Sequence, residues 1–168
     1  MRTAITRITV FWALGIAAGS AQAAGAAPCS TPEHRQFDFW IGDWQVRTPN
    51  GTVAGINRIT REYAGCVIHE HYATGRGYSG ESLNVYDTSR KVWHQTWVDD
   101  SGLLLTLEGS WNGTSMVLEG LAPTPGGAMA KQRITWTPAA DGSVRQLWEA
   151  ADAKGAWTVV FDGRYTKK

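Results

Sequence analysis

From residue 37 to residue 165 the chain consists of short segments in which apolar and polar residues alternate, separated by residues that favour turns. Such alternation is typical of strands with two unlike faces, because successive side chains point to opposite sides of a sheet. No stretch of this region keeps apolar residues at helical spacing over three turns. The pattern predicts strands at residues 37–48, 52–63, 66–74, 80–87, 91–98, 103–110, 115–121, 130–137, 143–150 and 156–165.

The connections between these segments have the length of hairpins and carry turn residues, as at Asn112-Gly113 and Asp141-Gly142. Consecutive antiparallel strands form a meander, and a twisted meander of this size removes its exposed edges by closing on itself. The expected fold is therefore all-β, an antiparallel up-and-down barrel of about ten strands. A looser connection at 122–129, rich in Pro and Gly, is interpreted as a hairpin, with a flap over an opening as the alternative.

The first 23 residues differ from the rest of the chain in composition. Arg2 and Arg7 come without an acidic residue, residues 8–19 are almost wholly apolar, and Ala21-Gln22-Ala23 follows. This order is typical of a secretory signal peptide cleaved after Ala23, and the apolar stretch is shorter than the roughly 20 residues that span a bilayer. We therefore expect a periplasmic or secreted protein without stable membrane insertion after cleavage. A buried N-terminal helix is the alternative.

The expected organisation is a signal peptide at 1–23, a lead-in at 24–36 and a barrel at 37–168. After cleavage 14 basic residues face 15 acidic ones, and no basic face indicates nucleic acid as a partner. Cys29 and Cys66 are the two cysteines of the chain. Two cysteines outside any redox motif favour a disulfide in an oxidising compartment, and this bond would tie the lead-in to the barrel.

The segment Phe37-Asp38-Phe39-Trp40-Ile41-Gly42-Asp43-Trp44 resembles the first strand of calycins, the superfamily of lipocalins and fatty-acid-binding proteins, with its G-x-W motif at Gly42 to Trp44. In calycins a last-strand arginine packs across this tryptophan, so the resemblance implies a structural contact between Trp44 and Arg164. Segments 66–71, 82–87, 93–99 and 144–149 resemble a family of secreted bacterial proteins of unknown function. That likeness implies an exported lipocalin-like barrel and brings no established activity.

Alternation also predicts which side chains line the lumen, if the large aromatic residues mark the inward face of each strand. The predicted ligand-binding residues are Glu70, Asn84, Tyr86, Gln95, Trp97, Arg133, Gln146 and Trp148, with Arg133 and Trp136 at the wall on opposite faces of their strand. Aromatic walls with a few amides and one carboxyl suit a small hydrophobic or amphipathic molecule, whose polar end the amides would orient. The alternative is a filled barrel in which these groups bond one another or buried water.

Glu70 is also the one candidate for catalysis. Burial among aromatic side chains would raise the pKa of its carboxyl toward the range of a general base, and Tyr86 or Arg133 would then stabilise an oxyanion. An isomerase or hydrolase is therefore an alternative function, although the chain has no G-x-S-x-G, HExxH or P-loop motif. A structural or interaction module without a cavity is another.

His69 and His71 stand two residues apart and share one face of their predicted strand. They would chelate a metal if His94 or His34 supplied a third ligand. The face assignment directs both outward, where solvated histidines need no ligand, so the sequence predicts neither a metal nor another cofactor. Haem is disfavoured because no histidine follows His94.

Overall fold

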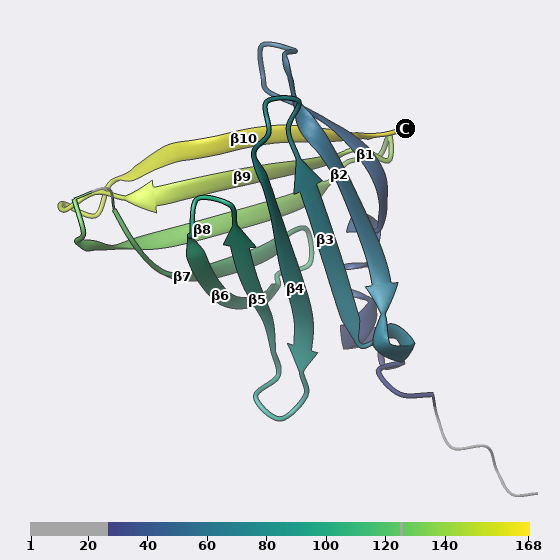
Figure 1. Cartoon of the computed structure of the whole chain (residues 1–168). Coiled ribbons are helices and arrows are strands. Elements are labelled where there is room, and N and C mark those ends of the chain that lie inside the picture. The colour runs from purple at the N-terminus through teal and green to yellow at the C-terminus, as the bar shows by residue number, and fades with distance from the viewer. Residues whose placement is uncertain (1–26, 125) are drawn as a thin grey trace, which may run out of the picture.

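The structure, a computed structural model, describes residues 27–124 and 126–168. Its strands form one closed antiparallel barrel, in which each strand pairs with its neighbours in sequence and the last strand pairs with the first (Figure 1). The predicted fold class, an all-β antiparallel barrel, is confirmed. The predicted signal peptide at 1–23 lies outside the described residues.

The ten strands match the expected order along the chain. They are β1 Gly42–Arg47, β2 Val53–Glu62, β3 Val67–Ala73, β4 Ser79–Asp87, β5 Val92–Asp99, β6 Leu104–Trp111, β7 Met116–Pro123, β8 Met129–Pro138, β9 Val144–Ala151 and β10 Trp157–Lys167. Three short 3₁₀ helices accompany them: η1 Pro32–Arg35, η2 Asp38–Trp40 and η3 Tyr63–Gly65. Among the described residues, no helix combines the length and the apolar character that crossing a membrane requires.

The strand predicted to begin at residue 37 begins instead at Gly42, and the residues before it form η2. Phe37 and Trp40 are both 0% exposed. Because a 3₁₀ helix has about three residues per turn, these two side chains lie on the same side, whereas a strand would place them on opposite faces. The apolar residues of this segment therefore favour a helical turn that buries both rings.

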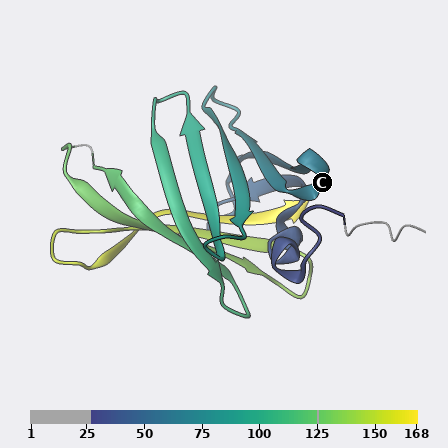
Figure 2. The same cartoon turned by 90° about the horizontal axis from the view of Figure 1, so that it is seen from below.

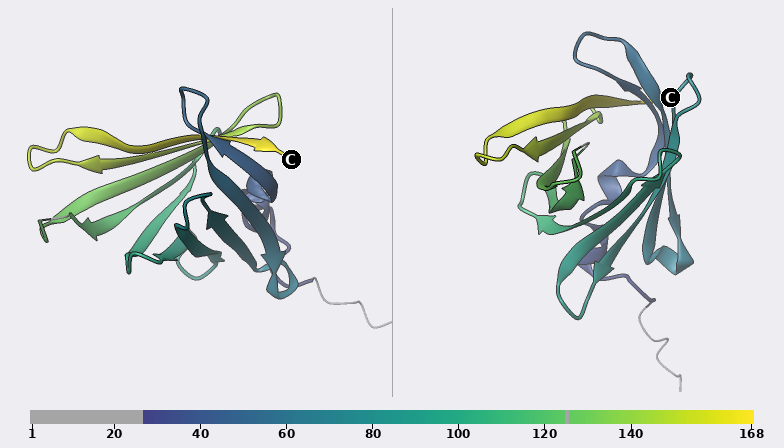
Figure 3. Two further views of the ribbon diagram at one scale, coloured as in Figure 1. Left: turned by 45° about the horizontal axis from the view of Figure 1, so that its top comes forward. Right: turned by 60° about the vertical axis from the view of Figure 1, so that its left-hand side comes forward.

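Residues 37–40 fill one end of the barrel, and we call them the end plug. The ring of Phe37 stacks on Trp40 at a centroid distance of 4.9 Å and meets the edge of Trp136 at 5.2 Å and of Trp93 at 5.6 Å. Figure 2 shows this helical segment beside the end of β10, and the right-hand view of Figure 3 shows it within the outline of the barrel. The end plug closes that end with aromatic side chains.

The predicted disulfide between Cys29 and Cys66 is present. It joins the segment before η1 to the residue that follows η3. The Arg35 guanidinium donates a hydrogen bond to the carbonyl oxygen of Gly65 at 3.0 Å, which adds a second tie between the same two regions. The lead-in is thus fastened to the barrel next to the end plug.

The cation over Trp44 is Lys167, and the predicted contact with Arg164 is wrong. Lys167 Nζ lies 3.9 Å from the centroid of the Trp44 ring, and Trp44 pairs with Lys167 across β1 and β10. Arg164 is adjacent to the inward-facing Tyr165, so it points outward, where its guanidinium forms an ion pair with Asp141. The indole N–H of Trp44 donates to the carbonyl oxygen of Trp40 at 2.8 Å, which attaches the end plug to β1.

The connection at 122–129 is shorter than predicted, because Ala122 and Pro123 belong to β7 and Met129 begins β8. The backbone N–H of Thr124 donates to the carbonyl oxygen of Ala128 at 2.8 Å, as expected of a hairpin. The hairpin interpretation of this connection is therefore confirmed.

Candidate functional site

The barrel interior contains a cavity of about 240 Å³ at the end away from the end plug. The strand β5 shows the separation, since Trp93 near its start contacts the end plug and Trp97 near its end lines the cavity. Tyr78 and Val160 also line the cavity and are 37% and 50% exposed. The cavity therefore reaches the surface at this end of the barrel.

The walls of the cavity are mainly apolar and aromatic, while its carboxyl and side-chain amide groups come from three strands. The apolar and aromatic walls include Tyr72, Trp97, Leu105, Ile134, Trp148 and Phe161. Among the predicted ligand-binding residues, the structure places Glu70, Gln95, Trp97, Gln146 and Trp148 in this lining. Alternation thus brings together side chains from β3, β5 and β9.

Three other predicted ligand-binding residues lie outside the cavity lining. Asn84 is buried behind it, and its side-chain amide donates to the hydroxyl of Ser82 at 2.9 Å. Tyr86 stands near the end of β4 that lies beside the end plug, and its ring centroid is 5.2 Å from that of His34. Asn84 and Tyr86 thus face the barrel interior, as predicted, but neither lines the cavity.

Arg133 faces outward and is also wrongly placed in the lining. Its neighbour Ile134 points inward, so alternation along β8 directs Arg133 to the outer surface. The guanidinium forms an ion pair with Glu149 at 2.9 Å and lies 4.2 Å from the ring centroid of Trp157. Neither Arg133 nor Tyr86 is thus placed to stabilise an oxyanion beside Glu70.

Glu70 is 3% exposed and lies at the centre of a buried network of hydrogen bonds. One carboxyl oxygen accepts from the Asn57 amide at 2.6 Å, and the other accepts from the Ser82 hydroxyl at 2.6 Å. Gln95 reaches the same set through Asn84, to whose side-chain oxygen it donates at 2.9 Å. Adjacent strands β2 to β5 therefore hold the carboxyl in one orientation.

The set continues to the last two strands through Tyr165. The Asn57 amide also donates to the Tyr165 hydroxyl at 3.3 Å, and this hydroxyl donates to the side-chain oxygen of Gln146. Burial raises the pKa of Tyr165 well above its ordinary value, which keeps the phenol protonated. We call the connected residues the polar floor: Asn57, Glu70, Ser82, Asn84, Gln95, Gln146 and Tyr165.

Three residues of the polar floor, Asn57, Ser82 and Tyr165, are not among the predicted ligand-binding residues, and Asn57 and Tyr165 lie in strands whose inward face was not assigned from the sequence. Both are inward positions of alternating strands, Asn57 between Gly55 and Ile59 in β2 and Tyr165 after Gly163 in β10. The same alternation that indicated Glu70 and Gln95 would have found them, had it been applied to those two strands.

The two tryptophans of the cavity wall are oriented by acceptors outside the polar floor. The Trp97 N–H donates to Asp99 at 3.0 Å, and the Trp148 N–H donates to the side-chain oxygen of Gln132 at 2.7 Å. The Tyr78 hydroxyl also donates to Asp99, at 2.8 Å. Partial burial opposes ionisation of Asp99, but hydrogen bonds from Ser101, Trp97 and Tyr78 outweigh it and lower its pKa to about 2. With their N–H groups satisfied, the rings present apolar surface to the cavity.

Burial raises the pKa of Glu70 from 4.5 to about 7, although hydrogen bonds from Ser82 and Asn57 act in the opposite direction. The unfolded chain therefore releases this proton at a lower pH than the folded protein, and ionisation costs the folded protein stability as pH rises from about 4.5 to about 7. Relative to the wild-type protein, Glu70→Gln should gain about 3 kcal/mol in free energy of unfolding between pH 4.5 and pH 8. Urea denaturation of both proteins at the two pH values measures this difference.

Glu108→Gln is the matched control, because Glu108 is exposed and hydrogen bonds from His94 and Arg90 lower the pKa of its carboxyl. The ionised Glu108 carboxyl stabilises the folded protein above the unfolded-state pKa, and this stabilisation is lost as the pH falls. Relative to the wild-type protein, the free energy of unfolding of Glu108→Gln should therefore fall as the pH rises, whereas that of Glu70→Gln should increase. If the free energies of unfolding of the wild-type protein and of Glu70→Gln changed with pH in parallel, the Glu70 carboxyl would not be desolvated.

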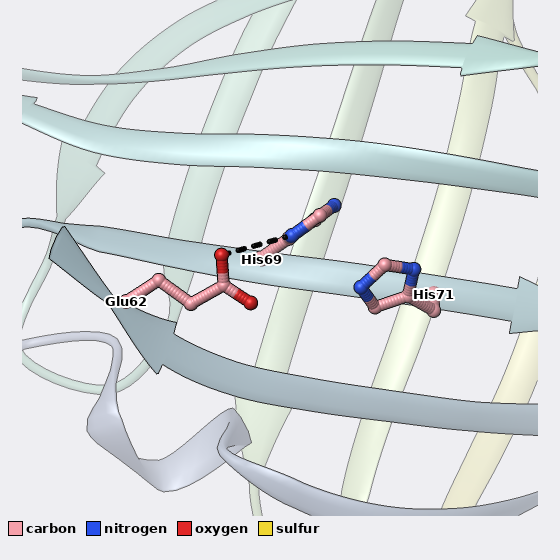
Figure 4. Close-up of side chains that lie close together, drawn as sticks. All are labelled: Glu62, His69 and His71. Atoms are coloured by element: carbon pink, nitrogen blue, oxygen red, sulfur yellow. Dashed lines mark ion pairs between the residues drawn. The ribbon is translucent and has the colours of Figure 1, made fainter.

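His69 and His71 point outward from β3, and the structure brings neither His34 nor His94 to them. His34 is buried in η1 against Tyr86, and His94 Nδ1 lies 3.0 Å from Glu108. The groups that do surround the pair are carboxylates, Glu62 on β2 and Glu81 on β4 (Figure 4 draws Glu62). Neither histidine considered as a third metal ligand therefore lies beside the pair.

A comparison of the chain with protein-family models and with curated protein sequences finds no match. The features that indicate a function are therefore the cavity, the polar floor and the outward histidine pair.

Proposed function

We propose that this protein binds a small amphipathic molecule in the barrel cavity, with a flat apolar body and one hydrogen-bonding end. The observation that carries the proposal is an aromatic cavity of about 240 Å³ with a buried carboxyl, Glu70, in its lining. Concave sites with mostly apolar walls and a few fixed polar groups are the usual form of small-molecule sites. Pockets for drug-sized ligands have volumes of about 300–1,000 Å³, so this smaller cavity suits a smaller ligand.

The wall and the floor would have different tasks in binding. Trp97 and Trp148 offer ring surface on β5 and β9, and desolvation of this surface would supply most of the affinity. Glu70, Gln95 and Gln146 offer hydrogen-bonding groups whose positions are fixed by the polar floor. Carboxylate and amide groups can make more hydrogen bonds than those within the polar floor, so they can also bond the polar end of a ligand, which favours an amphipathic molecule over a purely apolar one.

We also propose export and a calycin-like ancestry for this barrel. The signal-peptide pattern at 1–23 and the disulfide between Cys29 and Cys66 support a periplasmic or secreted location, because disulfides persist in oxidising compartments. The closed barrel and the buried Trp44 of the G-x-W motif support the calycin resemblance.

Native mass spectrometry of the protein purified from the periplasm of its own host tests the binding proposal. The expected result is one small molecule per chain, released and identified after denaturation. A mass equal to that of the polypeptide alone would contradict a resident ligand. The alternative, a barrel enzyme with Glu70 as general base, requires the same cavity, and it would be recognised by chemical conversion of the identified molecule that Glu70→Gln abolishes.

Filling the cavity should abolish binding without changing the outer surface. Leu105 lines the cavity and is 1% exposed, so Leu105→Trp would place an indole in the space that the ligand needs. With 2-naphthol as a flat probe carrying one hydroxyl, we expect Leu105→Trp to lower the affinity at least tenfold, measured by quenching of tryptophan fluorescence.

The matched control is Leu104→Trp, because Leu104 precedes Leu105 in β6 and is 59% exposed on the outer face. We expect less than a twofold change in 2-naphthol affinity for this variant. Equal losses for the two variants, or equal retention, would place the probe outside the cavity.

A further inference from the structure

The outer face of β3 carries two histidines between two glutamates. The rings of His69 and His71 have centroids 3.9 Å apart, and one potential ligand atom from each of Glu62, His69 and His71 lies within 4.8 Å of the others (Figure 4). Glu81 completes the group from the other side, on β4. This site is separate from the cavity, because Glu70, which lies between the two histidines in sequence, points to the opposite face of β3.

The sheet itself fixes these positions. His69 and His71 share a face because they are two residues apart in one strand. Across the sheet His71 pairs directly with Glu81, and Glu62 pairs with Val67, two residues before His69 and on the same face. Side chains that are paired directly or diagonally on one face lie within contact distance, so no loop has to move to bring the four groups together.

Glu81 orients both imidazole rings through one nitrogen of each. Its carboxylate oxygens lie 3.3 Å from His69 Nε2 and 3.0 Å from His71 Nδ1. If these two nitrogens carry the protons, His69 Nδ1 and His71 Nε2 are left as free donors of electron pairs. His69 Nδ1 lies 3.3 Å from the Glu62 carboxylate. A carboxylate that accepts from the non-ligating nitrogen is the usual partner of a metal-bound histidine.

The charges of the group favour a divalent cation. Two carboxylates beside two neutral imidazoles carry two negative charges, which one divalent ion would balance. Imidazole nitrogen and carboxylate oxygen are donors typical of Zn²⁺, which binds them at about 2.0–2.2 Å and accepts three protein ligands with a fourth position open to water.

We propose that Glu62, His69 and His71 bind one Zn²⁺ ion on the outer face of the barrel, with Glu81 as the positioning residue for both rings. The side chain of His69 is 18% exposed, whereas those of Glu62 and His71 are 36% and 41% exposed. His69 therefore serves as the fixed ligand, and rotation of the other two side chains would close the present spacing to that of a zinc site. This inference goes beyond the proposed function and does not depend on it.

Titration with Zn²⁺ alone tests the site, with untagged protein that has been treated with a chelator and returned to buffer at neutral pH. Isothermal titration calorimetry should give one ion per chain. We expect His71→Ala and Glu62→Gln each to lower the Zn²⁺ affinity at least tenfold. Glu81→Gln should lower it by about 10–100-fold, the usual effect of losing the partner of a ligating histidine. Circular dichroism would check that each variant remains folded.

His94→Ala is the matched control, because His94 is also an outward histidine beside a glutamate but is not paired with a second histidine as His69 and His71 are. Its Zn²⁺ affinity should change by less than twofold. The proposal would be overturned if the wild-type protein bound no Zn²⁺, if His71→Ala bound it as tightly as the wild type, or if His94→Ala lost as much affinity as His71→Ala.

Discussion

Trp40→Ala is expected to lower the free energy of unfolding by about 3–5 kcal/mol, because the change removes the largest ring of the end plug. Trp40 is 0% exposed and lies with its ring 5.3 Å from Trp136 and 6.5 Å from Tyr165. These contacts come from strands far apart in the sequence, so the surrounding rings cannot all move inward to fill the space. Urea denaturation followed by circular dichroism measures the loss.

Trp40→Phe separates loss of packing from loss of the polar group. Within the described residues, the Trp40 indole N–H is buried without a hydrogen-bond acceptor. Phenylalanine keeps an aromatic ring and removes this unsatisfied donor, so its cost should stay below about 1.5 kcal/mol. A cost of Trp40→Ala as small as that of Trp40→Phe would mean that the end plug is not packed into the barrel.

Removing the disulfide is expected to lower the free energy of unfolding by about 4 kcal/mol. Cys29 and Cys66 are 37 residues apart in sequence, and a cross-link over a loop of that length restricts the unfolded chain by about this amount. Chemical denaturation of the double variant Cys29→Ser, Cys66→Ser, compared with the oxidised wild-type protein, measures the effect.

The reduced wild-type protein is the control for this comparison. It should be as stable as the double variant, because both lack the cross-link and both keep the hydrogen bond from Arg35 to Gly65. If the double variant stays within about 1 kcal/mol of the oxidised protein, the chain-entropy account of this bond is wrong.

The barrel could be predicted from sequence because nearly every strand has one face toward the core and one toward solvent. Residues such as Ile68, Trp93 and Ile134 alternate with outward polar residues, and this period of two specifies both the strand and its inward face. The start of β1 could not be predicted in the same way. The alternation of Phe37, Asp38 and Phe39 is that of a strand, whereas the contacts that bury Phe37 in the 3₁₀ turn come from Trp93 on β5 and Trp136 on β8.

The cavity was predicted in part. Alternation gives the face of a strand, and it identified Glu70 and Gln95 as inward, but it gives no depth along the barrel axis. Tyr86 shares its inward face with Ser82 and yet lies toward the end plug rather than in the cavity. Which inward residues reach the cavity and which lie toward the end plug depends on the tilt and stagger of the strands in the closed sheet, and these are set by the pairing between strands.

The partner of Trp44 shows the same limit. The resemblance implied Arg164, and the choice between Arg164 and Lys167 depends on which residues of β10 point inward. Tyr165 does, so Lys167 shares its face and Arg164 does not. A shift by one residue in that strand would have exchanged them, and a single sequence offers no measurement of that register.

Pairing of β1 with β10 has a consequence for the newly made chain. Trp44 meets Lys167 in the closed sheet, so nearly the whole sequence must be available before the ring of strands is complete. Until then β1 and the latest strand present unpaired edges, which can join to edges of other chains, and such long-range pairing is slow to form. Tyr165 of β10 also belongs to the polar floor, so this set of hydrogen bonds is completed only when the last strand is in place. Synthesis and release of this protein include an interval of exposed edges, during which aggregation competes with closure.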